Sequence, residues 1–167
     1  MANKAVFLDR DGTIMHDHGY IKDPQKVDIL PGVSEAVDIL IDNGFMLFIV
    51  TNQSGIGRGI MTMADVNKVN DKMLSYIGRN KIKEILICPH GPDESCSCRK
   101  PGLKLVEAAE KKYKLDLKYS YSIGDKDCDR QLGENFGGTG IKIGEKGIKN
   151  LLNAAIFIIE KENSNKK

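Results

Sequence analysis

The segment Phe7-Leu8-Asp9-Arg10-Asp11-Gly12-Thr13 is the most informative for the fold of this chain, because it places two carboxylates directly after an apolar run at 5–8. Short apolar runs with polar ends are typical of buried parallel strands. The chain contains four further runs of this kind, at 45–50, 85–87, 119–123 and 139–143. The pattern therefore predicts five strands in one parallel sheet.

Longer stretches with helical spacing of apolar residues separate these runs, at 33–43, 63–78, 102–113 and 126–136. Gly44 suits the C-terminal end of the first helix, and Thr62 suits the N-cap of the second. Strands that alternate with helices predict βαβ units and therefore an α/β fold with a doubly wound parallel sheet. We expect one domain over 1–159, with no insert long enough for a separate cap domain, and a frayed polar tail at 160–167. Within that domain, 148–152 is expected to form a helical turn and 156–159 a last short strand.

Composition limits the possible classes of protein. The 167 residues are 41% hydrophobic and 29% charged, which suits one globular domain, and the formal net charge of +2 leaves no electrostatic footprint for nucleic acid. No apolar run reaches the roughly 20 residues of a membrane span, and the N-terminal residues carry no signal-peptide pattern. Aromatic residues make up only 6%, and no helix shows an apolar interface. We therefore expect a cytoplasmic monomer that binds neither nucleic acid nor membrane.

Polar residues follow directly after four of the predicted strands: Asp9, Thr51, Cys88 and Asp125. Because ligands of such sheets bind beyond the carboxyl ends of the strands, these residues should share one edge. In the pair Asp9 and Asp11, one carboxylate can act as a nucleophile and the other as a proton shuttle. With Asp125 they suit Mg²⁺, which prefers oxygen ligands. The alternative for the pair alone is a solvated Asp-x-Asp-Gly turn.

Two further segments suit a phosphate group. The hydroxyl of Thr51 and the backbone N–H groups of 52–55 can bind phosphate oxygens, the alternative being a simple N-cap and turn. Lys100, which follows Arg99 just ahead of a predicted helix, can neutralise the charge of a phosphoryl group. Surface exposure is the commoner fate of such a basic pair and is the competing interpretation.

Three cysteines and a histidine lie within eleven positions: Cys88, His90, Cys96 and Cys98. In a reducing compartment such a cluster is more often a metal site than a set of disulfides. Three thiolates and an imidazole make a closed set of four ligands suited to structural Zn²⁺. The alternative, a buried free cysteine beside an incidental histidine, fits this spacing poorly. We expect zinc to rigidify 88–98 and to present the basic pair that follows, whereas Cys128 is expected only to pack.

Four motifs, in this order and each at the end of a predicted strand, resemble the haloacid dehalogenase superfamily of phosphotransferases; they lie at 7–13, 51–55, 99–101 and 124–129. The resemblance covers nearly the whole chain, from residue 7 to about residue 143. It implies a Mg²⁺-dependent phosphatase in which Asp9 is the nucleophile that becomes phosphorylated and Asp11 is the general acid and base. By the same resemblance, the phosphoryl group is held by Thr51 and Lys100. The metal is bound by Asp9, Asp125 and the backbone carbonyl of Asp11, and Asp129 supports the metal site.

The cysteine segment together with 99–101 is similar to a group that contains both heptose-bisphosphate phosphatases and histidinol phosphatases. Segments 17–20 and 51–59 resemble the D-glycero-D-manno-heptose 1,7-bisphosphate 7-phosphatases, whereas 84–90, 99–107 and 131–135 resemble the histidinol phosphatases. We give more weight to the loops that face the substrate, because function lives in the site and not in the fold. The favoured substrate is therefore heptose bisphosphate, with histidinol phosphate as the alternative. The residues implied to contact the substrate are Asp17, His18, Gly19, Tyr20, Asn52, Gln53, Ser54, Arg58, Arg99 and Lys126.

A third hypothesis is a non-catalytic, zinc-stabilised binding module with a relic pocket. Receiver domains also form an aspartyl-phosphate and use a hydroxyl and a lysine, but they need neither Asp11 nor the cysteine cluster. The intact set of Asp9, Asp11, Lys100 and Asp125 therefore favours an enzyme.

Overall fold

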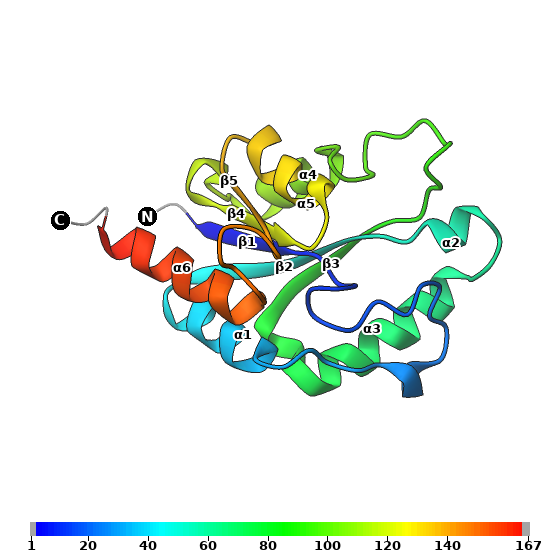
Figure 1. Ribbon diagram of the computed structural model, residues 1–167. Helices are drawn as coiled ribbons and strands as arrows, with labels where there is room; N and C mark the ends of the chain where they lie inside the picture. The colour runs from blue at the N-terminus through cyan, green and yellow to red at the C-terminus, as the bar shows by residue number, and fades with distance from the viewer. Residues whose placement is uncertain (1–2, 165–167) are drawn as a thin grey trace.

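The computed structural model describes residues 3–164, and its centre is a parallel sheet of five strands in the order β3-β2-β1-β4-β5 (Figure 1). The strands are β1 Lys4–Leu8, β2 Phe45–Asn52, β3 Ile82–Cys88, β4 Tyr121–Gly124 and β5 Thr139–Lys142. All four neighbouring pairs run parallel. The doubly wound sheet predicted from the alternating pattern is confirmed.

Helices cover both faces of this sheet (Figure 1). One layer packs α1 Val33–Asp42, α3 Met63–Ile77 and α6 Leu151–Ser164 against it, and the other packs α4 Lys104–Tyr113 and α5 Asp127–Asn135. The short helix α2 Ser54–Gly57 follows β2, and single 3₁₀ turns lie at η1 Pro24–Lys26, η2 Arg79–Lys81 and η3 Leu117–Tyr119.

Strand β1 shows why its sequence is apolar throughout. Val6 and Leu8 join the core under the first helix layer, whereas Ala5 and Phe7 join the core under the second. Alternate side chains of a strand point to opposite faces, so a strand covered on both sides must be apolar at every position. The same sheet brings the carboxyl ends of β1, β2, β3 and β4 to one edge, where the site lies.

Thr62 caps α3 as predicted: its hydroxyl accepts a hydrogen bond from the backbone of Asp65, and the Asp65 side chain accepts one from Thr62 in return. Gly44 lies just beyond the end of α1 with φ of +83°, a conformation that glycine adopts without strain.

The C-terminal predictions are wrong. Residues 156–159 are helical, not a strand, because α6 is continuous from Leu151 to Ser164. Its buried residues Leu151, Ala154, Ala155 and Ile158 recur at helical spacing and pack into the core of the first layer. The expected helical turn at 148–152 is only the approach to this helix and its first residues. The frayed tail is wrong for 160–164, where Glu162 accepts hydrogen bonds from Lys4 and Tyr121; 165–167 lie outside the described residues.

None of the helices within residues 3–164 combines the length and the apolar character that crossing a membrane requires.

Candidate active site

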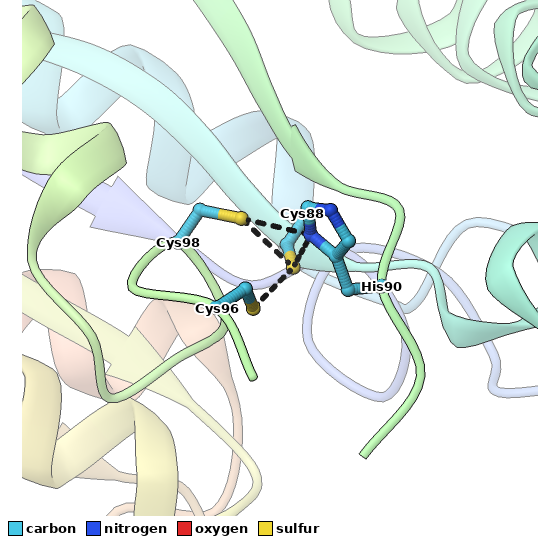
Figure 2. A group of neighbouring side chains, drawn as sticks. All are labelled: Cys88, His90, Cys96 and Cys98. Carbon is cyan, nitrogen blue, oxygen red and sulfur yellow. Dashed lines mark hydrogen bonds between the residues drawn. The ribbon is translucent and has the colours of Figure 1, made fainter. Parts of the chain in front are cut away.

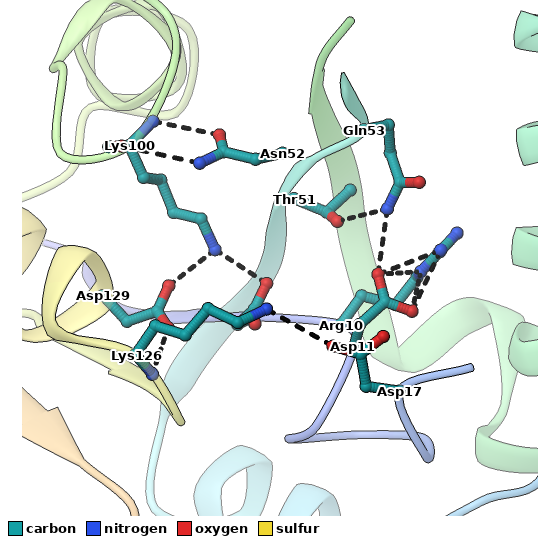
Figure 3. A network of polar contacts seen from close by, with 10 residues as sticks. Arg10, Asp11, Asp17, Thr51, Asn52, Gln53, Lys100, Lys126 and Asp129 are labelled. Atoms are coloured by element: carbon teal, nitrogen blue, oxygen red, sulfur yellow. Dashed lines mark hydrogen bonds and ion pairs between the residues drawn. The ribbon is translucent and has the colours of Figure 1, made fainter. Parts of the chain in front are cut away.

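Lys100 is the centre of a buried ion-pair network at the carboxyl edge of the sheet (Figure 3). Its Nζ lies 2.7 Å from Oδ1 of Asp9, just beyond β1, and 2.6 Å from Oδ1 of Asp129, in the first turn of α5. All three residues are buried. Burial alone would lower the pKa of Lys100, but the charges of Asp9 and Asp129 outweigh it and leave that pKa raised. Lys100 is therefore a fixed cation that touches the predicted nucleophile.

Asp125 adds a third carboxylate to this edge directly after β4. Oxygens of Asp9, Asp125 and Asp129 lie within 4.8 Å of one another, and Oδ1 of Asp125 is buried without a hydrogen-bond partner in the described part of the chain. Burial, and next the charge of Asp9, raise the pKa of Asp125 to about 6. An orphaned carboxylate oxygen beside two more carboxylates fits a hard divalent cation, whose binding would satisfy that oxygen.

Gly12 allows this close approach. Its φ is +80°, and a side chain at this position would collide with the Asp125 carboxylate. The turn after Asp11 and the end of β4 can therefore meet only because residue 12 is glycine.

Asp11 is held on the other side of the site. Its carboxylate accepts hydrogen bonds from Arg10 Nε at 3.1 Å, from Arg10 Nη2 at 3.0 Å and from Gln53 Nε2 at 3.0 Å. Burial raises the pKa of Asp11, and Arg10 opposes that rise. Of the three residues predicted to bind Mg²⁺, Asp9 and Asp125 lie in the acidic cluster, but the side chain of Asp11 does not, and Asp129 stands there instead. Only the backbone carbonyl of Asp11, the atom that the resemblance implies, stays a candidate ligand.

The residues that end β2 are tied to the rest of the site. Thr51 is buried, and its Oγ1 accepts a hydrogen bond from Gln53 Nε2 at 2.7 Å. The amide of Asn52 accepts from the backbone N–H of Lys100 at 3.0 Å and donates to its carbonyl at 3.5 Å. Asn52 and Gln53, predicted to contact substrate, thus hold Lys100 and Asp11 in place through these contacts.

The other predicted substrate residues surround this edge. Asp17, His18, Gly19 and Tyr20 form an exposed loop, which reaches the far side of the site where Lys126 Nζ lies 3.4 Å from Asp17 Oδ2 (Figure 3). Ser54 begins α2, and the exposed Arg58 follows it. Arg99 is half-buried and donates to the carbonyl of His90 at 3.3 Å. Their contacts with a substrate stay predictions.

The predicted metal cluster is assembled (Figure 2). Ligand atoms of Cys88, His90, Cys96 and Cys98 lie within 4.8 Å of one another, with Cys88 Sγ 3.3 Å from Cys98 Sγ and His90 Nδ1 3.2 Å from Cys98 Sγ. Cys88 ends β3, and Cys98 lies two residues before Lys100. Three thiolates and an imidazole that converge on one point can hold a metal ion.

The segment 88–98 also supports the loop that follows β2. The carbonyl of Cys88 accepts a hydrogen bond from the backbone N–H of Gln53, and the carbonyl of Pro89 accepts one from Gly57, both at 2.8 Å. A side chain at Gly57 would collide with Glu94 and with the backbone of Gly91. The metal cluster and the loop 52–58 therefore form one unit.

Sequence reasoning missed the polar pair Arg10 and Asn70. Arg10 is fully buried, and its Nη1 donates to Oδ1 of Asn70 on α3 at 2.9 Å. One signal was available: Asn70 is the polar member of the buried stripe of α3, which also contains Val66, Val69, Met73 and Ile77. A polar residue inside an apolar helical stripe requires a buried partner.

Comparisons with known proteins fit this geometry. A family model described as polynucleotide kinase 3 phosphatase matches residues 4–143. A D-glycero-beta-D-manno-heptose-1,7-bisphosphate 7-phosphatase of Helicobacter pylori strain J99 is 38% identical over 137 residues, which cover 80% of this chain and 78% of that protein. The chain therefore belongs to the family that this model describes, which is part of the haloacid dehalogenase superfamily.

Two further members of the superfamily are informative. The histidine biosynthesis bifunctional protein HisB of Blochmanniella floridana is 39% identical over 147 residues, which cover 85% of this chain and 41% of that longer protein. The crystal structure of D,D-heptose 1,7-bisphosphate phosphatase from B. bronchiseptica, complexed with magnesium and phosphate, superposes with a TM-score of 0.83 at 28% identity. That superposition covers 95% of this chain and 99% of that one.

Proposed function

We propose that this chain is a Mg²⁺-dependent phosphatase that removes the 7-phosphate of D-glycero-D-manno-heptose 1,7-bisphosphate through an aspartyl-phosphate. The contact between Lys100 and Asp9, with Asp11 two residues further on, carries the proposal. A buried carboxylate beside a fixed cation suits a nucleophile that attacks an anionic phosphoryl group. The second carboxylate supplies the proton transfers that turnover requires.

Asp9, Asp11, Lys100 and Thr51 each have a role in the reaction. An oxygen of Asp9 attacks phosphorus, and the bond from phosphorus to the leaving oxygen breaks. Asp11 gives its proton to that leaving oxygen, then takes a proton from the water that hydrolyses the phosphoenzyme. Lys100 balances negative charge next to Asp9. The oxygen of Thr51 accepts a hydrogen bond from Gln53, so its hydroxyl proton can be donated to a phosphoryl oxygen.

The groups that would hold Mg²⁺ are Asp9, Asp125 and the backbone carbonyl of Asp11. Asp129 lies next to them and pairs with Lys100. Bound there, the ion supplies neutralisation of charge on the phosphoryl group. The orphaned Asp125 oxygen supports this assignment.

The choice of substrate rests on the relatives and on the cations around the site. The Helicobacter pylori relative is named for heptose 1,7-bisphosphate, as is the B. bronchiseptica protein. A bisphosphate needs cations beyond Lys100 for its second phosphate, and Lys126, Arg99 and Arg58 are the candidates. Histidinol phosphate is the second candidate substrate, favoured by the 39% identity to HisB.

We also propose that the cluster of Cys88, His90, Cys96 and Cys98 binds structural Zn²⁺, because all four positions are filled by protein ligands. Cysteines that ligate a metal and form no disulfide are typical of a reducing compartment, which supports a cytoplasmic location. We expect the working unit to be a monomer.

Phosphate release tests the function. The panel contains the α and β anomers of heptose 1,7-bisphosphate, L-histidinol phosphate and, because of the family description, a 3′-phosphorylated oligonucleotide, each with Mg²⁺. We expect a heptose anomer to lead by about 100-fold in kcat/KM, equivalent to roughly 2.7 kcal/mol. Faster release from histidinol phosphate would assign the second candidate. No release above that of Asp9→Asn would refute the phosphatase and favour the binding module.

A further inference from the structure

Arg10 is a fully buried cation that the proposed chemistry does not use. It lies between Asp9 and Asp11 in the sequence, and its guanidinium contacts Asp11 (Figure 3) and Asn70 of α3. Arginine is rarely buried without a partner. Its presence beside the proposed proton carrier therefore requires an explanation.

The donors of Arg10 are divided between two partners. Nη1 donates to Asn70 Oδ1 at 2.9 Å, whereas Nε and Nη2 both donate to the Asp11 carboxylate at 3.0 to 3.2 Å. Each of the two Asp11 oxygens accepts from the guanidinium, which is the planar fork that only arginine provides. Asn70 thus orients the guanidinium of Arg10, and the guanidinium fixes the plane of the Asp11 carboxylate.

A second contact completes the clamp. Gln53 Nε2 also donates to Asp11 Oδ2, at 3.0 Å. Asp11 is thus held by Gln53, just beyond β2, by Arg10 of its own turn, and indirectly by Asn70 of α3. A carboxylate that must give a proton to one atom and later take one from water gains from a single fixed orientation.

We propose that Arg10, aimed by Asn70, is a positioning residue that orients the carboxylate of Asp11 for proton transfer. The inference rests on the proposed function, in which Asp11 is the general acid and base. The alternative is that Arg10 and Asp11 form a buried ion pair that only stabilises the fold.

Leaving-group dependence separates these two roles. An alkyl phosphate needs a proton on its leaving oxygen, whereas p-nitrophenolate leaves readily without one. A misplaced Asp11 should therefore slow the alkyl ester selectively. The ratio of the two kcat/KM values within one preparation does not depend on the fraction of protein that is folded, so partial unfolding cannot imitate the effect.

The variants are Arg10→Lys, which keeps the charge but loses the paired donors, and Asn70→Leu, which removes the acceptor while keeping the branching of the side chain. The substrates are p-nitrophenyl phosphate and the primary alkyl ester that the wild type hydrolyses faster, heptose 1,7-bisphosphate or L-histidinol phosphate. We expect both variants to lose about 100-fold or more in kcat/KM for the alkyl ester and less than about 5-fold for the aryl ester, as for loss of a general acid. Asn70→Asp, which keeps an acceptor oxygen, should restore most of the ratio. Asn67→Leu on the exposed face of α3 is the matched control and should leave the ratio unchanged.

Acid-quenched protein gives a second readout. Because the same carboxylate activates water, Asn70→Leu should accumulate more phosphoenzyme than the wild type during turnover of p-nitrophenyl phosphate. Equal losses on both substrates without such accumulation would overturn the positioning role. Asp11→Asn tests the underlying function: if it too shows no leaving-group selectivity, the assignment of Asp11 as the acid fails and the inference with it. If Asp11→Asn is selective and the Arg10 and Asn70 variants are not, only the inference is refuted.

Discussion

Replacing Lys100 by methionine should destabilise the protein far more than the loss of a surface ion pair. The ammonium lies 2.7 Å from Asp9 and 2.6 Å from Asp129, and these side chains are 7% and 1% exposed. Methionine fills nearly the same volume, so the change removes the charge without leaving a large cavity. Two carboxylates then face each other in a buried site with no cation between them.

Removing one partner of a buried ion pair costs about 3–5 kcal/mol, since the remaining charge has lost its compensation. We expect a loss of about 3 kcal/mol in the free energy of unfolding at pH 8. For a chain of this size that corresponds to a fall in Tm of roughly 6–12 °C. Lys112→Met is the matched control, because its ammonium lies 2.8 Å from Glu84 with 59% of its side chain exposed. Exposed pairs contribute at most about 1 kcal/mol.

The loss should depend on pH in a defined direction. Burial, and next the charge of Asp9, already raise the pKa of Asp129, and Lys100 opposes that rise; removing Lys100 raises the pKa further. When the pKa of a carboxyl is higher in the folded state than in the unfolded state, the protein loses stability as the pH rises from the unfolded-state pKa through the folded-state pKa. The deficit should therefore be largest at pH 8 and smaller at pH 5, where the carboxyl takes up a proton.

The assay is urea unfolding at both pH values in buffer without added Mg²⁺. Lys100→Met with Asp129→Asn should recover part of the loss, because only one buried carboxylate then lacks its cation. A deficit below about 1 kcal/mol at pH 8, or one equal at both pH values, would show that the ion pair does not act as described.

Three further outcomes are expected. Gly12→Ala should weaken Mg²⁺ binding by about tenfold or more, because the new side chain collides with the Asp125 carboxylate; an unchanged Mg²⁺ titration would contradict this. Mg²⁺ affinity should fall up to about tenfold per pH unit below the Asp125 pKa of about 6, since binding needs the ionised carboxylate; calorimetry showing constant affinity from pH 7 to 5 would refute it. Cys98→Ser should reduce bound zinc, measured by elemental analysis, and lower the Tm relative to Cys128→Ser, whose sulfur lies outside the cluster; full zinc content in both would disprove the ligand assignment.

The core of the fold could be predicted because its signals are local. Each strand of the sheet is a short apolar run, and both faces of β1 are covered, so the run has no polar interruption. The C-terminal error has the opposite cause. The four residues 156–159 are as apolar as a strand, and only their register with Leu151 and Ala154 shows that they belong to a helix. A window of four residues cannot distinguish the two periods.

The site could be predicted as a set of residues but not as a set of contacts. The rule that parallel strands end on one edge correctly collects Asp9, Thr51 and Asp125, since it depends only on topology. It does not say which donor meets which acceptor. The amide of Asn52 binds the backbone of Lys100, and this exchange spans 48 residues with no sequence signal.

The position of Lys100 gives a physical reason for a cluster of potential metal ligands beside this site. Unlike Asp9 and Thr51, Lys100 does not follow directly from a strand; it ends a segment of twelve residues after β3 that contributes little to either core. A buried ammonium at the end of a mobile segment would lose its ion pairs whenever the segment moved. Two attachments prevent this: Cys98 lies in the metal cluster two residues before Lys100, and Asn52 binds both backbone groups of Lys100 itself. The clustered side chains of Cys88, His90, Cys96 and Cys98, together with Asn52, therefore take the place of an apolar core in fixing the cation that faces Asp9.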